Sequence, residues 1–312
     1  MGDPVEVLVE RLLDGNRRAL SRVMTLIERD SPEGRRALAL LYPRTGKTHT
    51  IGLTGSAGSG KSTLVGALAR EYRLRGRTLG IVAIDPTSPF SQGALLGDRI
   101  RMQDLTADRD VFLRSMATRG SLGGLAPTTA GVVSALDAFG KDVVLVETVG
   151  AGQDEVEVAA MADTTVVVLT PGSGDDVQAM KAGIMEIADI LVVNKSDLPN
   201  ADLLARQLAS IIDAGAHGRR RTPIVRTASA RDEGIAELVE ALDEHGAYIA
   251  QPEVQRAHRE KQARHQVLAL ARQALMERVV ATHADGRLEE LIADVASRRI
   301  DPHTAADALI GD

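Results

Sequence analysis

The chain has 312 residues, of which 44% are hydrophobic and 26% charged, with a formal net charge of -6 and no cysteine. Such a composition is that of an ordinary globular protein. The acidic balance and the 2% aromatic content disfavour a nucleic-acid-binding function, and the absence of cysteine excludes disulfides, thiolate metal sites and cysteine nucleophiles.

The amino-terminal residues 1–47 predict a small helical extension. Apolar residues recur at helical spacing between Val5 and Leu41, with breaks around Gly15 and Pro32. The start is acidic and lacks the basic-then-apolar order of a secretory signal. The longest apolar stretches, such as Thr164 to Leu169, are far shorter than the roughly 20 residues of a membrane helix. We therefore expect a cytoplasmic protein that does not contact a membrane.

Residues 48–250 alternate short apolar runs with helical stretches. Runs of this kind are typical of parallel strands buried on both faces. The pattern predicts a doubly wound α/β domain with a mostly parallel sheet. The expected strands are Ile51 to Leu53, Leu79 to Ile84, Val143 to Val146, Val166 to Leu169, Ile190 to Val193, and Ile224 to Val225.

A phosphate-binding loop follows the first of these strands and precedes a helical run. Residues 55–62 fit the pattern G-x-x-x-x-G-K-[ST], whose backbone N–H groups surround phosphate oxygens. Lys61 is expected to reach the β and γ phosphates, and the Ser62 hydroxyl to bind Mg²⁺. The loop residues are Gly55, Ser56, Ala57, Gly58, Ser59, Gly60, Lys61, Ser62 and Thr63.

Two further loops indicate that the base is guanine. Asn194, Lys195 and Asp197 follow a buried strand and match the N-K-x-D pattern of GTPases. The Asp197 carboxylate can accept hydrogen bonds from both N1–H and N2–H₂ of guanine, a pair of donors that adenine lacks. The segment after the last strand resembles the loop whose backbone meets guanine O6, and it contains Ala228, Ser229 and Ala230.

Carboxylates end two other strands, at Asp85 and Glu147. A strand-end acid often caps a helix, but beside a phosphate loop both favour Mg²⁺ coordination. Residues 147–150 occupy the place of the GTPase D-x-x-G motif. Ala151 stands where Ras-like proteins carry a catalytic Gln, and Gln153 lies two residues further on. We therefore expect slow intrinsic hydrolysis that a partner stimulates.

After Pro252 the chain becomes rich in Arg and Ala, with apolar residues at helical spacing such as Val267, Leu268 and Leu275. Residues 251–312 therefore predict helices. They would form either a packed helical tail or a surface through which two copies associate.

Taken together, these motifs resemble the MeaB/ArgK family of P-loop GTPases, which are associated with methylmalonyl-CoA mutase. The resemblance covers essentially the whole chain. Its most specific segments are residues 85–90, which read Asp-Pro-Thr-Ser-Pro-Phe, and residues 147–150, which read Glu-Thr-Val-Gly. The likeness also includes residues 174–176 with Lys181, and residues 301–307 near the end.

The resemblance implies GTP or GDP with Mg²⁺ as cofactors and an adenosylcobalamin-dependent acyl-CoA mutase as partner, whose cofactor loading and protection the protein would gate. It makes residues 86–99 switch I, 147–156 switch II, 172–184 a further switch, and 251–312 a homodimerisation arm. The metal ligands would be Ser62, Asp85, Asp98 and Glu147. The catalytic residues would be Lys61, Asp98, Glu147, Gly150, Gln153 and Lys181.

The chain departs from the family pattern at Ala57, Ala151 and Asp154. The added carboxylate at Asp154 indicates either a different mutase partner or a neutral surface change. Two alternative functions remain. A metallochaperone GTPase would need Cys or clustered His ligands, which are scarce here. A small-molecule kinase of the arginine-transport type would need an acceptor pocket and a base, for which no separate motif is evident.

Overall fold

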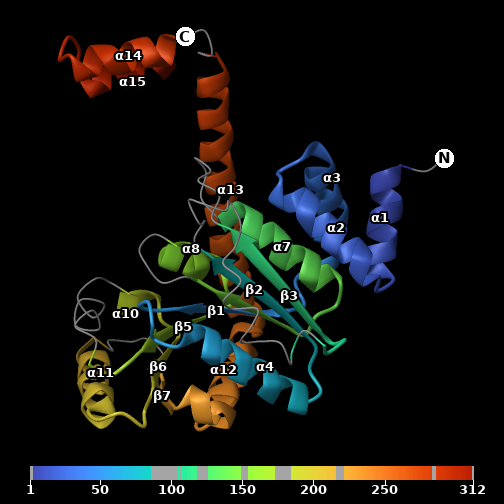
Figure 1. Cartoon of the computed structure of the whole chain (residues 1–312), viewed down its shortest axis with the longest axis vertical. Coiled ribbons are helices and arrows are strands. Elements are labelled where there is room, and N and C mark those ends of the chain that lie inside the picture. The colour runs from blue at the N-terminus through green and yellow to red at the C-terminus, as the bar shows by residue number, and fades with distance from the viewer. Residues whose placement is uncertain are drawn as a thin grey trace.

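The computed structural model describes residues 3–85, 105, 107–117, 126–148, 154–172, 184–215, 221–282 and 286–310. At its centre lies a parallel sheet in the order β3-β2-β4-β1-β5-β6-β7 (Figure 1). The expected doubly wound P-loop fold is confirmed. The strands are β1 (His49–Thr54), β2 (Leu79–Asp85), β3 (Val111–Ala117), β4 (Val143–Glu147), β5 (Thr164–Leu169), β6 (Ile190–Asn194) and β7 (Ile224–Thr227).

Sequence reasoning missed the strand β3. It pairs in parallel with β2, from Val111 beside Leu79 to Ala117 beside Asp85. Arg114 and Ser115 interrupt its apolar residues, so it lacks the continuous run of a central strand. An edge strand tolerates such residues because only one side of it is covered by a neighbouring strand.

Helices cover both faces of the sheet because successive strand residues point to opposite sides. In β4, Val143 and Leu145 join the core beneath α4 (Lys61–Leu74) and α12 (Ile235–Ile249), whereas Val144 and Val146 join the opposite core. That second face carries α7 (Ala126–Ala138), α8 (Asp154–Met161) and α11 (Ala201–Gly215), with the short α10 (Ile184–Ile187) preceding β6.

The amino-terminal extension consists of α1 (Pro4–Leu13), α2 (Arg17–Glu28), α3 (Pro32–Leu41) and the 3₁₀ turn η1 (Tyr42–Arg44). Side chains cap the three helices: Asp3 accepts from Val5 N, Asn16 from Arg18 N, and Ser31 from Gly34 N, each at 3.0 Å. The extension shares one hydrophobic cluster with β2, β3 and α7, so it is packed onto the domain.

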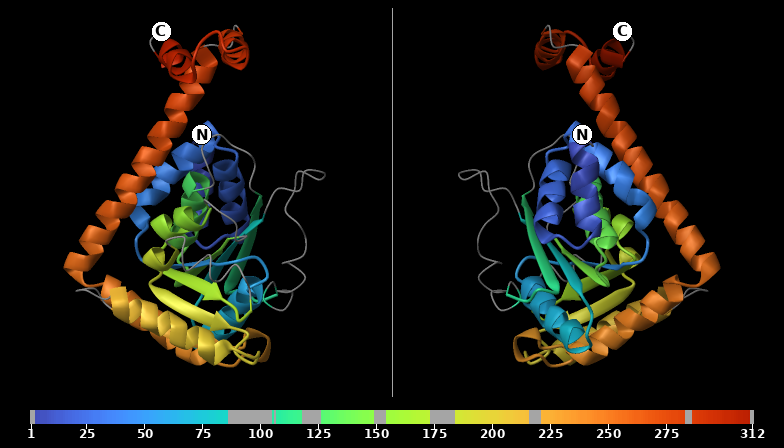
Figure 2. Two further views of the ribbon diagram at one scale, coloured as in Figure 1. Left: turned by 90° about the vertical axis from the view of Figure 1, so that its left-hand side faces the viewer. Right: turned by 90° about the vertical axis from the view of Figure 1, so that its right-hand side faces the viewer.

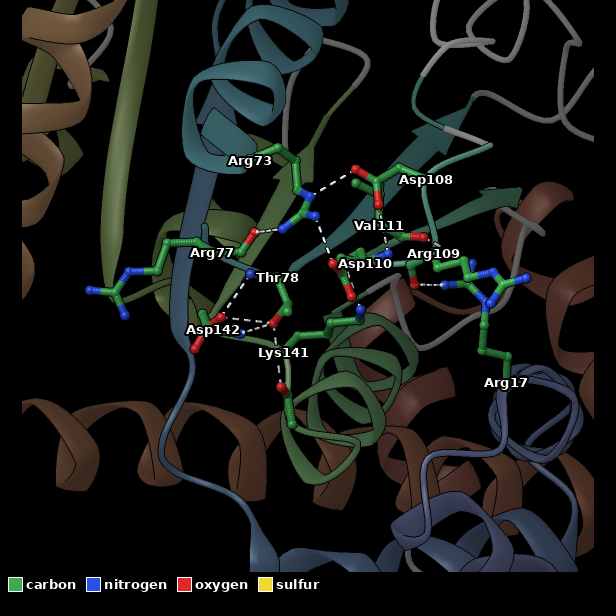
Figure 3. Close-up of polar contacts among 11 residues, drawn as sticks. Arg17, Arg73, Arg77, Thr78, Asp108, Arg109, Asp110, Val111, Lys141 and Asp142 are labelled. Atoms are coloured by element: carbon green, nitrogen blue, oxygen red, sulfur yellow. Dashed lines mark hydrogen bonds and ion pairs between the residues drawn. The ribbon is translucent and has the colours of Figure 1, made fainter. Parts of the chain in front are cut away.

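Arginines from two helices hold the turn that leads into β3 (Figure 3). Arg17 of α2 donates to the Val111 carbonyl at 2.8 Å. Arg73 of α4 donates to the Asp108 carboxylate at 2.8 Å and to that of Asp110 at 2.6 Å. The edge of the sheet is therefore fastened to both the extension and the domain.

The carboxyl-terminal helices are α13 (Pro252–Thr282), α14 (Arg287–Ala296) and α15 (Pro302–Ile310). The 31-residue α13 has no buried residue and runs along the outside of the domain, with α14 and α15 at its far end (Figure 2). Near its start, Gln262 Nε2 donates to the Met161 and Ala162 carbonyls at 2.9 and 3.2 Å, at the end of α8. None of the described helices is long and apolar enough to cross a membrane.

Candidate nucleotide-binding site

The phosphate loop joins the carboxyl end of β1 to the first turn of α4, as the sequence predicts. Gly55 and Gly60 have φ angles of 139° and 89°, a backbone region that favours glycine. A Cβ at Gly55 would lie 2.2 Å from the Val168 carbonyl oxygen, and one at Gly60 would lie 2.6 Å from Asn194 Nδ2. The loop can therefore curl this tightly only with glycine at these two positions.

Lys61 lies inside this curl and is buried. Its ammonium Nζ donates to the carbonyl oxygens of Gly55 at 2.8 Å and Ser56 at 2.9 Å. The amino end of α4 and the loop amides add positive potential at the same place. Polyphosphate would therefore meet a buried cation and backbone donors together.

The next residue, Ser62, faces the end of β4. Its Oγ lies 2.5 Å from Oε1 of Glu147, a carboxylate that is 5% exposed. A hydroxyl and a carboxylate side by side are the oxygen donors that Mg²⁺ prefers, so these two residues fit the metal. Asp85 ends β2 as expected, but its side chain lies outside the described residues.

Asn194 joins the phosphate loop to both base loops. Its Nδ2 donates to the Ser59 carbonyl at 2.8 Å, and its Oδ1 accepts from Thr227 Oγ1 at 3.0 Å and Ser229 N at 3.2 Å. The side chain is 1% exposed, so all three bonds are shielded from water. One asparagine thereby joins the phosphate loop to the carboxyl ends of β6 and β7, where the base is expected to lie.

The remaining base-loop residues lie around this asparagine. Lys195 has a φ of 55° and donates from Nζ to the Gly58 carbonyl at 2.8 Å, which lays its stem beside the phosphate loop. Asp197 Oδ2 is 3.1 Å from a guanidinium nitrogen of Arg231. Residues 229–231 form the short 3₁₀ turn η2 (Ser229–Arg231), which contains Ser229 and Ala230.

The structure therefore brings together the predicted phosphate-loop residues, Glu147 and the two base loops. The predicted residues Asp98, Gly150, Gln153 and Lys181 lie outside the described residues, as do most of the three expected switches. Arg231 was missed by the sequence reasoning. The sequence does place Arg231 directly after Ser229 and Ala230, in the loop that is expected to contact the base, and this position could have identified it.

Comparison with known proteins shows which family the chain resembles along most of its length. The family model for the methylmalonyl-CoA mutase-associated GTPase MeaB matches residues 20–284. A Pyrococcus abyssi protein whose name assigns it provisionally to the GTPases is 44% identical over 98% of this chain and 96% of its own length. The GTPase ArgK of Escherichia coli is 37% identical over 75% of this chain and 73% of its own.

Among solved structures, a protein described as the LAO/AO transport system kinase superposes with a TM-score of 0.74. The superposition covers 99% of this chain and 98% of that one, at 23% sequence identity. At this identity the likeness concerns the fold alone.

Proposed function

Since the chain belongs to the MeaB family of methylmalonyl-CoA mutase-associated GTPases, we propose that it is a GTP-binding and GTP-hydrolysing chaperone that gates the loading, protection and reactivation of an adenosylcobalamin-dependent acyl-CoA mutase. One observation carries the nucleotide part. Asn194, at the carboxyl end of β6, hydrogen-bonds to both the phosphate loop and the last base loop. The groups that would bind the phosphates and those that would bind guanine therefore lie at the same ends of the strands.

The roles of the described residues follow from their chemistry. Amides of the loop and Lys61 bind the phosphates, and Asp197 accepts the guanine N1–H and N2–H₂. Ser62 and Glu147 hold Mg²⁺, which when bound neutralises charge on the phosphate oxygens. Asp85 and Asp98 are proposed as further oxygen ligands.

Slow intrinsic turnover is part of the proposal. Ala151 cannot orient a water molecule, so Gln153, or a group that the mutase supplies, would complete the site. Gly150 and Lys181 are proposed to sense and relay the state of the γ-phosphate. The switches at 86–99, 147–156 and 172–184 would then present two surfaces to the mutase, depending on the nucleotide.

We further propose a homodimer formed through residues 251–312. Two observations support it. Helix α13 exposes large apolar side chains of the kind that interfaces bury, including Leu268, Leu275 and Val267. In addition, α13 carries six Lys or Arg against three Glu, whereas residues 286–310 carry three Arg against five acidic residues. Helices of opposite charge balance suit pairing between two copies.

The test is GTP hydrolysis by the purified protein, alone and with a co-encoded adenosylcobalamin-dependent mutase. ATP and Lys61→Ala serve as controls. We expect slow basal turnover, marked stimulation by the mutase with GTP only, and loss of both rates in the variant. Turnover that is fast alone and indifferent to every such mutase would contradict the chaperone role while leaving the GTPase intact.

A further inference from the structure

We propose that Arg231 is a positioning residue for guanine recognition, because it holds the Asp197 carboxylate in the orientation that accepts N1–H and N2–H₂. This inference rests on the proposed function, since it concerns the same base site. It adds Arg231, from the loop after β7, to the phosphate loop and the N-K-x-D motif that the sequence revealed.

The carboxylate of Asp197 depends on Arg231 for its orientation. Their side chains pair at 3.1 Å, and among the described residues Arg231 is the partner of this carboxylate. By contrast, Asn194 is fixed by three hydrogen bonds and is buried. A carboxylate on a short side chain with a single partner is free to rotate once that partner is removed.

The pairing with Arg231 leaves room for the base. Each carboxylate oxygen offers two lone pairs, so Oδ2 can accept from Arg231 and from guanine together. The Asp197 side chain is 27% exposed, which keeps it accessible to a ligand. A charge-assisted pair therefore orients the acceptor without occupying all of its capacity.

The backbone of Arg231 is itself well anchored. Arg231 N donates to the Ala228 carbonyl at 2.8 Å, and Ala228 forms an antiparallel bridge with Glu233. The next residue, Asp232, has a φ of 56° and pairs with Arg70 of α4 at 2.7 Å. The guanidinium thus projects from a turn that the helix behind the phosphate loop holds in place.

The experiment measures the Kd values of GDP, IDP and ADP by competition with a fluorescent GDP, for the natural chain and for Arg231→Ala. IDP lacks the N2 amino group, so its binding depends less on the orientation of Asp197. We expect the Kd of GDP to rise about three- to tenfold and that of IDP to rise less, so that discrimination between them falls. Arg231→Lys, which keeps the charge, should restore part of the discrimination.

The matched control is Arg226→Ala, which also removes an arginine from an ion pair, in this case with Asp202. It should leave the Kd values of GDP and IDP unchanged. In an Asp197→Asn background, Arg231→Ala should have no further effect on GDP. An unchanged ratio of GDP to IDP affinity in Arg231→Ala, or tighter GDP binding, would overturn the inference alone. A natural chain that does not prefer GDP to ADP would instead overturn the guanine site of the proposed function.

Discussion

A buried chain of polar side chains crosses the amino ends of β1 and β5. His49 Nε2 lies 2.7 Å from Thr164 Oγ1, which lies 2.8 Å from His245 Nδ1, and His245 Nε2 is 3.5 Å from an Asp189 carboxylate oxygen. A hydroxyl has one hydrogen to donate. All contacts are satisfied when both rings are neutral: His49 donates to Thr164, Thr164 to His245, and His245 to Asp189.

This chain predicts a loss of stability in acid. Burial lowers the pKa of His49 from its usual 6.5, so below that pH the unfolded chain binds a proton that the folded chain resists. The free energy of unfolding should therefore fall as the pH drops through 6.5, with a contribution of at most about 1.4 kcal/mol per pH unit. Urea unfolding of the natural chain and of His49→Gln at pH 7.5 and 5.5 measures it.

In His49→Gln this part of the pH dependence should disappear. The exposed His303 of α15 provides the control, because His303→Gln should keep the slope of the natural chain. If the free energy of unfolding changed equally with pH in all three proteins, the pH dependence would come from a group other than His49.

The carboxylate of Asp197, proposed to read the guanine base, should determine which nucleotide binds. Asp197→Asn replaces one acceptor oxygen by a donor NH₂, which faces the donors of guanine but suits the O2 carbonyl of xanthine. The Kd of GDP should rise at least about tenfold and that of XDP should fall. Competition binding with the two nucleotides measures the exchange, and equal weakening of both would contradict the assigned role.

Among elements, β3 and α2 are joined by a bidentate pair. Arg114 donates from Nε and a terminal nitrogen to the two carboxylate oxygens of Glu28, each at 2.6 Å, with about one-fifth of either side chain exposed. Glu28→Gln should lower the free energy of unfolding by about 1 to 3 kcal/mol, because Arg114 would keep its charge in a partly desolvated place. Denaturant unfolding measures the change.

The exposed pair of Arg35 and Asp30 in the same extension is the comparison. Asp30→Asn should cost less than about 1 kcal/mol, since water screens that pair and Asn tolerates the φ of 48° at this position. Equal costs for Glu28→Gln and Asp30→Asn would mean that the pair of Arg114 and Glu28 stabilises the fold no more than a screened surface pair does.

The apolar residues of α13 make a prediction about assembly. Leu268→Glu with Leu275→Glu places charges on a helix that the proposed dimer would bury, so the molar mass measured by light scattering should fall to that of one chain. Leu74→Glu is the control, because Leu74 is 84% exposed at the end of α4 and does not belong to residues 251–312. A dimer that survives the double change would place the interface elsewhere.

For the whole molecule, motif and periodicity were enough to predict the architecture. Central strands contain continuous apolar runs, such as residues 190–193, because both of their faces are buried. The phosphate loop is recognisable from its glycines. The edge strand β3 was not predicted because Arg114 interrupts its apolar run. The charge is tolerated there because Arg114 pairs with Glu28 of α2, outside the sheet. The pair of Arg231 and Asp197 joins two loops that are adjacent only after folding, so no local pattern reveals it.

The contact between Gln262 and the end of α8 has a mechanical consequence. Helix α13 bends away from α12 at residue 252, and at a rise of about 1.5 Å per residue Gln262 lies about 15 Å from that end and Thr282 about 45 Å. With the α12 end as fulcrum, a shift of about 1 Å at Gln262 moves Thr282 about 3 Å, because a rigid helix sweeps in proportion to length. Gln262 contacts the carboxyl end of α8, a helix that begins directly after residues 147–153 of the proposed switch II. If nucleotide binding displaces α8, α13 would therefore enlarge that displacement at its far end, where α14 and α15 lie.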